Sequence, residues 1–181
     1  MSEERVMSEE SVTSKNQTTR RSVLIGSAAA AATAAAILPH RAAGQSLMRG
    51  PFTVEGWKAS WADPSPERVK IRVPTIAAPG IAGYWPRTTR PVRGPQQYAQ
   101  RIIDLLTFVP DFRAELVEHA TNGDIIFIRW IARGTGPNGR FEAVGADRLI
   151  VPNGYVAENL ILSDHPIFAA FAKHVGDLRA D

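Results

Sequence analysis

The chain has 181 residues, of which 44% are hydrophobic, and a formal net charge of +3. This length suits one globular domain with a core of its own. Because the chain contains no cysteine, disulfides, thiolate zinc sites and cysteine nucleophiles are excluded. From residue 45 onward, 16 Lys and Arg residues are scattered among 14 Asp and Glu residues, so we expect no nucleic-acid partner.

Residues 1–44 indicate a disordered start followed by an export signal, and we assign the folded domain to residues 45–181. Arg20 and Arg21 precede an apolar, alanine-rich stretch that ends in small residues, which is the order of a secretory signal. The arginine pair resembles a twin-arginine signal. A retained membrane anchor is the alternative, although residues 23–38 are shorter than the roughly 20 apolar residues that span a bilayer. We expect a periplasmic or secreted protein that leaves the membrane once the signal is cleaved. The motif MSEE occurs twice, so Met7 is a second candidate start.

The sequence of the first half of the domain predicts three helices and a loop. Apolar spacing predicts a helix over residues 52–61 with Thr53 as its N-cap. Ser65 followed by proline predicts a second helix start, which leads into an extended piece at residues 71–76. Prolines and glycines over residues 78–94 predict a loop without a long regular element. The next segment, residues 96–109, predicts the longest helix.

The second half changes to the alternating pattern of strands. Strands are predicted over residues 112–120, 125–133, 140–151 and 155–163, with Asn122 and Gly123 forming a hairpin turn between the first two. Helices followed by an antiparallel meander predict an α+β domain with the helices packed on one face of the sheet.

Asp147 is the only charged residue on one side of the third predicted strand. A buried carboxylate must be hydrogen-bonded, paired or protonated, and an acid in an apolar cavity acquires a raised pKa, which suits proton transfer near neutral pH. Pairing with an arginine such as Arg129, in a purely structural role, is the alternative. Gly145 nearby would allow a ligand or another backbone to approach closely.

Asp164 and His165 stand where the fourth predicted strand meets a helix that begins at Pro166. Asp164 is in phase with Val156 and Leu162, so its side chain could enter the space that this face bounds. Capping the following helix is the alternative role for either residue. His165 is also a candidate for proton transfer.

Other catalytic patterns are missing from the sequence. Its histidines lack the spacing of a metal site, no nucleophile elbow occurs, and GTGPNG is a turn rather than a phosphate loop. Aromatic side chains could instead line a pocket for a flat apolar ligand, with packing in the core as the alternative. These candidates are Trp57, Trp61, Tyr84, Trp85 and Trp130.

Three segments, WADPSPERV, GPQQYAQRIIDLLTFVPDFRAELVEHATNGD and GADRLIVPNGYVAENLILSDHPIF, together resemble the SnoaL-like polyketide cyclase family of the nuclear-transport-factor-2-like superfamily. The resemblance implies a cone-shaped barrel, in which a curved antiparallel sheet packs on three to four helices around an apolar pocket. It also implies aldol ring closure without metal or cofactor. Asp164 matches the family's catalytic aspartate in position, and Asp147 resembles a pocket carboxylate of several members.

The resulting hypothesis is an exported acid/base enzyme acting on a small carbonyl compound, in which Tyr84 or His165 would stabilise the developing enolate. A noncatalytic ligand-binding or scaffold protein of the same fold is the competing hypothesis. Isomerases, dehydratases and epoxide hydrolases of the superfamily are further alternatives, although KIRVPTI lacks the carboxylate that many relatives carry there. The resemblance also implies a homodimer through the convex face of the sheet.

Overall fold

The structure is a computed structural model that describes residues 50–179. The predicted export signal therefore lies outside the described residues. Within them, no helix combines the length and the apolar character needed to cross a bilayer.

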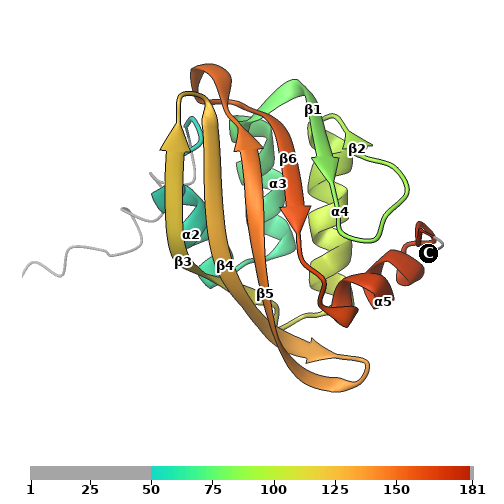
Figure 1. Cartoon of the computed structure of the whole chain (residues 1–181). Helices are drawn as coiled ribbons and strands as arrows, with labels where there is room; N and C mark the ends of the chain where they lie inside the picture. The colour runs from blue at the N-terminus through green and yellow to red at the C-terminus, as the bar shows by residue number, and fades with distance from the viewer. Residues whose placement is uncertain (1–49, 180–181) are drawn as a thin grey trace, which may run out of the picture. The chain divides into compact units, whose positions relative to one another are not determined.

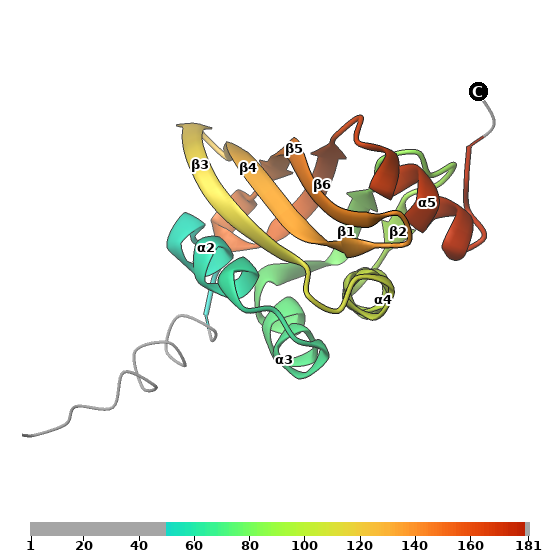
Figure 2. The same cartoon turned by 90° about the horizontal axis from the view of Figure 1, so that it is seen from below.

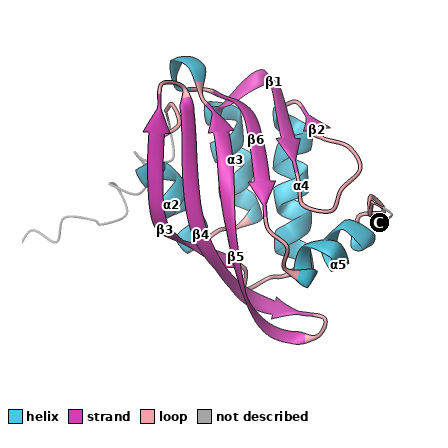
Figure 3. Cartoon of the chain, viewed as in Figure 1, coloured by secondary structure: helices cyan, strands magenta, loops and turns pink. Residues whose placement is uncertain are grey.

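Along the described residues, two helices, two strands and a third helix come first, and a meander of four strands and a last helix follow (Figure 3). The helices are α2 (Val54–Ala62), α3 (Pro66–Ile76), α4 (Pro95–Phe108) and α5 (Pro166–His174), with a short 3-10 turn η1 (Pro152–Gly154). The strands are β1 (Ala77–Tyr84), β2 (Val92–Arg93), β3 (Arg113–Asn122), β4 (Ile125–Gly136), β5 (Gly139–Ile150) and β6 (Val156–Leu162).

The six strands form one sheet in the order β2-β1-β6-β5-β4-β3 (Figure 1). Neighbouring strands are antiparallel except β1 and β6, which run parallel, so the sheet is mixed rather than wholly antiparallel. The sheet is curved, and α2, α3 and α4 cover its concave face, whereas α5 lies beside its β1 and β2 end (Figure 2). The predicted α+β class, a curved sheet packed on helices, is confirmed.

The predicted helix starts are confirmed by their caps. The Thr53 hydroxyl accepts a hydrogen bond from the Gly56 amide at 3.0 Å, and the Ser65 hydroxyl accepts one from the Arg68 amide at 3.3 Å. Each cap satisfies an amide that has no partner inside its own helix. Helix α4 begins at Pro95 and buries the face that its spacing predicts.

Two predictions for residues 71–94 are wrong. Residues 71–76 belong to α3, which includes Pro74 although this proline cannot donate a hydrogen bond to the carbonyl of Lys70, and the helix ends two residues later at Ile76. Residues 77–84 form β1 instead of a loop. Pro79 is tolerated there because the β1–β6 register shifts between Ala77 and Ala82, so the intervening residues are outside the regular ladder.

The predicted phase of the last strand is also wrong. Val156 is buried, but the next buried residues of β6 are Asn159 and Ile161, so the alternation shifts by one residue. The irregular β1–β6 register covers the same stretch, and a one-residue shift moves every following side chain to the opposite face. Leu162 and Asp164 are consequently exposed.

Candidate functional site

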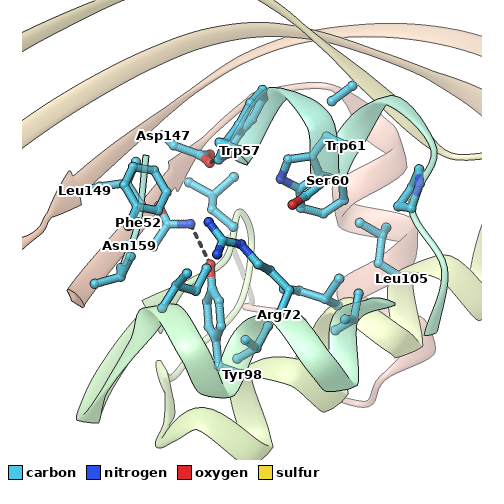
Figure 4. A pocket seen from close by; sticks show the side chains of 18 of the residues that line it. Phe52, Trp57, Ser60, Trp61, Arg72, Tyr98, Leu105, Asp147, Leu149 and Asn159 are labelled. Atoms are coloured by element: carbon cyan, nitrogen blue, oxygen red, sulfur yellow. Dashed lines mark hydrogen bonds between the residues drawn. The ribbon is translucent and has the colours of Figure 1, made fainter. Parts of the chain in front are cut away.

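A cavity lies between the concave face of the sheet and helices α2, α3 and α4 (Figure 4). The empty space of this cavity, counted together with the part that is open to solvent, is about 1020 Å³. Its lining is mainly apolar and aromatic, with a small number of polar side chains, as is usual for small-molecule sites. The polar side chains are Ser60, Arg68, Arg72, Tyr98, Asp147 and Asn159.

Asp147 of β5 is 5% exposed and is held by two indole groups. Its Oδ2 accepts a hydrogen bond from Trp57 Nε1 at 3.1 Å, and its Oδ1 accepts one from Trp130 Nε1 at 3.0 Å. The predicted alternative, a pair with Arg129, is wrong, because Arg129 contacts Glu118 instead, at 3.5 Å. One donor comes from a helix and the other from a strand, so the carboxylate joins α2 to the sheet.

Burial raises the pKa of Asp147 from 3.8 to about 6. The hydrogen bonds from Trp130, Trp57 and Asn159 act in the opposite direction, because they stabilise the ionised form. The indole groups are neutral, so they leave the carboxylate without a compensating charge. Asp147 therefore exchanges its proton in the pH range where a general base is most effective.

Gly145 explains how Trp130 reaches the carboxylate. The two residues face each other across β4 and β5, and a Cβ atom at position 145 would lie 2.2 Å from the indole ring. Only glycine leaves room for the ring to lie across the strand. The predicted close approach at Gly145 is present, and the approaching group is the Trp130 side chain.

Tyr98 of α4 and Asn159 of β6 form a second polar group in the cavity wall (Figure 4). Asn159 Nδ2 donates a hydrogen bond to the Tyr98 hydroxyl at 2.8 Å. Burial, and then the nearby charge of Asp147, raise the pKa of Tyr98 well above its usual range. Tyr98 therefore stays protonated, and its own hydrogen is available to an acceptor in the cavity. Gly83 leaves room for the tyrosine ring, because a Cβ atom there would lie 2.5 Å from it.

Arg72 extends from α3 into the cavity (Figure 4). It is 4% exposed, and its Nη1 donates a hydrogen bond to the Gly50 carbonyl at 3.0 Å. Its Nη2 is buried without a hydrogen-bond partner among the described residues. Burial lowers the pKa of Arg72 from its usual value, although an arginine remains charged at physiological pH.

The structure brings only some of the predicted site residues together. Asp147 and the four tryptophans Trp57, Trp61, Trp85 and Trp130 line the cavity, whereas Tyr84, Asp164 and His165 do not.

The two residues of the strand–helix junction lie outside the cavity and differ in what they do. Asp164 is exposed, and the N-cap of α5 is His165, whose Nδ1 accepts a hydrogen bond from the Ile167 amide at 3.2 Å. The His165 ring packs on Phe141, with 5.4 Å between ring centroids. Asp164 and Asp147 therefore do not converge on one site.

Sequence reasoning assigned no role in the site to Arg72, Tyr98 and Asn159. Arg72 follows the buried Val69 by three residues on α3, so an arginine on an apolar helix face was the available signal. Asn159 is in phase with Ile161, but the shifted alternation of β6 concealed this. Within residues 50–179, no group of three or more potential metal-ligating side chains occurs.

No protein-family model matches the sequence, and no curated protein matches it either. Solved structures do match. A hypothetical protein of ketosteroid isomerase-like fold from Catenulispora acidiphila, crystallised with trimethylamine, is 14% identical with a TM-score of 0.57, covering 68% of this chain and 94% of that chain. The domain therefore has the ketosteroid isomerase-like fold.

Other proteins with this fold are candidate polyketide cyclases. IdmH of Streptomyces antibioticus is 20% identical with a TM-score of 0.53, covering 66% of this chain and 95% of its own. A protein from Acidithiobacillus ferrooxidans is 12% identical with a TM-score of 0.53, covering 72% of this chain and 94% of its own. At such identities the similarity concerns the fold. The cone-like α+β fold that the resemblance implied is therefore confirmed, and membership of the SnoaL-like family stays a prediction.

Proposed function

We propose that the domain is a cofactor-independent acid/base enzyme that acts on a small, mostly apolar or aromatic carbonyl compound. The observation that carries the proposal is Asp147, a carboxylate buried in an apolar cavity with a pKa of about 6. Perturbed carboxyl groups of this kind are typical of general bases. The candidate polyketide cyclases of the same fold support aldol ring closure as the reaction type.

The proton transfer uses two residues with separate roles. Asp147 removes a proton from the carbon next to a carbonyl group, and the electron pair of that C–H bond moves to the carbonyl oxygen. The Tyr98 hydroxyl donates a hydrogen bond to this oxygen and stabilises the enolate. The enolate carbon then attacks a second carbonyl of the same molecule, and the resulting alkoxide takes the proton back from Asp147.

The two tryptophans that hold Asp147 orient its carboxylate for this reaction. Each oxygen accepts one indole N–H, and with the hydrogen bond from Asn159 three of about four lone-pair sites of the carboxylate are engaged, which leaves one for the substrate proton. Asp164, the residue that the resemblance favoured, has no role in the proposal because it lies outside the cavity.

A noncatalytic ligand-binding protein would have the same aromatic cavity but would not transfer protons. Deuterium exchange separates the two functions. The full chain is incubated in D₂O with 2-tetralone, whose protons next to the carbonyl are acidic, and exchange is followed by NMR. We expect catalysed exchange that falls by at least about 100-fold in Asp147→Asn, the usual size of a general-base contribution.

Asp164→Asn is the matched control, since it removes an exposed carboxylate of the same type. It should exchange like the wild type. Exchange that survives in Asp147→Asn, or that is lost in Asp164→Asn, would contradict the assignment of the base. Binding of 2-tetralone without any catalysed exchange would favour the noncatalytic alternative.

Export through the N-terminal signal is part of the proposal, supported by the arginine pair and the apolar stretch that follows it. In a bacterial host with a twin-arginine pathway, the full chain should reach the periplasm. Replacing both Arg20 and Arg21 by lysine should retain it in the cytoplasm, as cell fractionation would detect.

A further inference from the structure

Arg72 is a buried cation for which the described residues supply no anion. It is 4% exposed, and none of their ion pairs includes it. One nitrogen, Nη1, is satisfied by the Gly50 carbonyl, and Nη2 has no hydrogen-bond partner within residues 50–179. Leaving a buried charge without an opposite charge is costly, so such groups are paired in nearly all proteins.

Asp147 does not fill this role, although it lines the same cavity. Both of its carboxylate oxygens are engaged by Trp57 and Trp130, and Arg72 is not among the groups that shift its pKa. The unpaired nitrogen of Arg72 and the carboxylate of Asp147 are therefore separate polar features of one apolar space.

Arg68, the other arginine of α3, differs from Arg72 in both exposure and pairing. It lies one helical turn before Arg72 and also lines the cavity, but its side chain is 46% exposed and forms a 2.7 Å ion pair with Asp63. Burial without an ion pair is therefore a feature of Arg72 and not of both arginines on this helix. Arg68 also provides a matched control.

We propose that the ligand of this cavity carries a carboxylate, which Arg72 binds through Nη2. The substrate class then follows from the proposed function, on which this assignment rests: it is an apolar or aromatic keto acid. Its carboxylate binds Arg72 while its reacting carbonyl lies at Tyr98 and Asp147. A guanidinium group surrounded by apolar side chains suits a singly charged planar carboxylate. Among the described lining residues the other cation, Arg68, is already paired, so a dianionic phosphate would lack a second partner.

Isothermal titration of the full chain with 2-naphthoate and 2-naphthamide tests the inference, because the two probes have the same shape and differ in charge. Wild type should bind the carboxylate about tenfold more tightly or better, the usual gain from a hydrogen bond to a charged group. Arg72→Met should lose this preference while it still binds the amide, and Arg68→Met should keep it.

Thermal unfolding without ligand distinguishes a binding role from a structural one. Removing a buried charge that no described residue neutralises should leave Arg72→Met at least as stable as the wild type. If Arg72→Met does not fold, Arg72→Gln replaces it, because glutamine is neutral and can still donate to the Gly50 carbonyl.

Equal binding of the two probes by the wild type, or failure of the carboxylate to bind, would overturn the inference. So would a preference that persists without Arg72 or disappears without Arg68. These measurements need no turnover, and Asp147→Asn should retain the preference. The wild type could show no preference for the carboxylate and still catalyse Asp147-dependent deuterium exchange. That result would contradict the keto-acid substrate class but not the proposed function.

Discussion

Asp147 links the chemistry of the cavity to the stability of the protein. Its pKa is 3.8 in an ordinary setting and about 6 in the folded state, so the folded protein holds this proton more tightly than the unfolded chain does. The stabilisation is complete below about pH 4 and is lost as the pH rises through about 6. Above that pH, the ionised carboxylate remains buried at a cost.

The free energy of unfolding of the wild type, taken relative to Asp147→Asn, should therefore fall by on the order of 3 kcal/mol between about pH 4 and pH 7. Urea unfolding of both proteins across this range measures the difference. Asparagine does not titrate, so the other ionisable groups cancel in the comparison. A difference that does not change with pH would show that Asp147 is not buried as described.

Asp147 could be predicted from the sequence because its strand alternates regularly over twelve residues and carries one charge on its inner side. Asp164 could not be placed in the same way, because it follows a strand whose alternation shifts. The partners of Asp147 were beyond sequence reasoning. Trp57 is 90 residues away along the chain, and only the docking of α2 on the sheet brings its indole to the carboxylate.

Helix α5 depends on a local contact that is independent of the cavity chemistry. The imidazole of His165 caps its N-terminus by accepting the Ile167 amide at 3.2 Å. His165→Ala should lower the free energy of unfolding by about 1 kcal/mol, and His165→Asn should recover most of the loss, because asparagine is among the best N-caps.

Chemical denaturation gives this energy, and deuterium exchange of 2-tetralone is the parallel measurement. Exchange should be unchanged in folded His165→Ala. A loss of exchange with unaltered stability would instead restore His165 as the proton-transfer residue that the sequence suggested.

Among the elements, those with strong local signals were predicted and those fixed by pairing were not. Thr53 and Ser65 marked their helices correctly, because a cap is a contact between residues three apart. Strand β1 contains a proline and two glycines and has weak local preference for a strand. It forms because β6 lies beside it on one edge and β2 on the other, and a single sequence does not reveal either neighbour.

The outer face of the sheet is the part of the domain that no described helix covers. Val144 is 49% exposed and Leu162 is 50% exposed, and Phe127 is exposed on the same face. The charged residues around them form ion pairs within the sheet, such as Arg133 with Glu142 at 2.9 Å. The face therefore combines exposed apolar side chains with ion pairs whose charges cancel, which suits contact with an identical copy.

We propose a homodimer through this face, as the family resemblance implied. Light scattering coupled to size-exclusion chromatography should give the mass of a dimer for the wild type and of a monomer for the double variant Val144→Glu, Leu162→Glu. Ile71→Glu is the control, since Ile71 is an exposed apolar residue of α3 on the other side of the molecule. A monomeric wild type, or a dimer that persists in the double variant, would contradict the proposal.

The distribution of tryptophan in this protein has a practical consequence. The chain contains four tryptophans, and all four line the cavity. The tryptophan fluorescence of the protein thus originates from the walls of one compartment, and two of the four indoles donate hydrogen bonds to the carboxylate of Asp147. The protein therefore carries a built-in optical reporter, in which occupancy of the compartment and the proton on Asp147 can both be followed without a label.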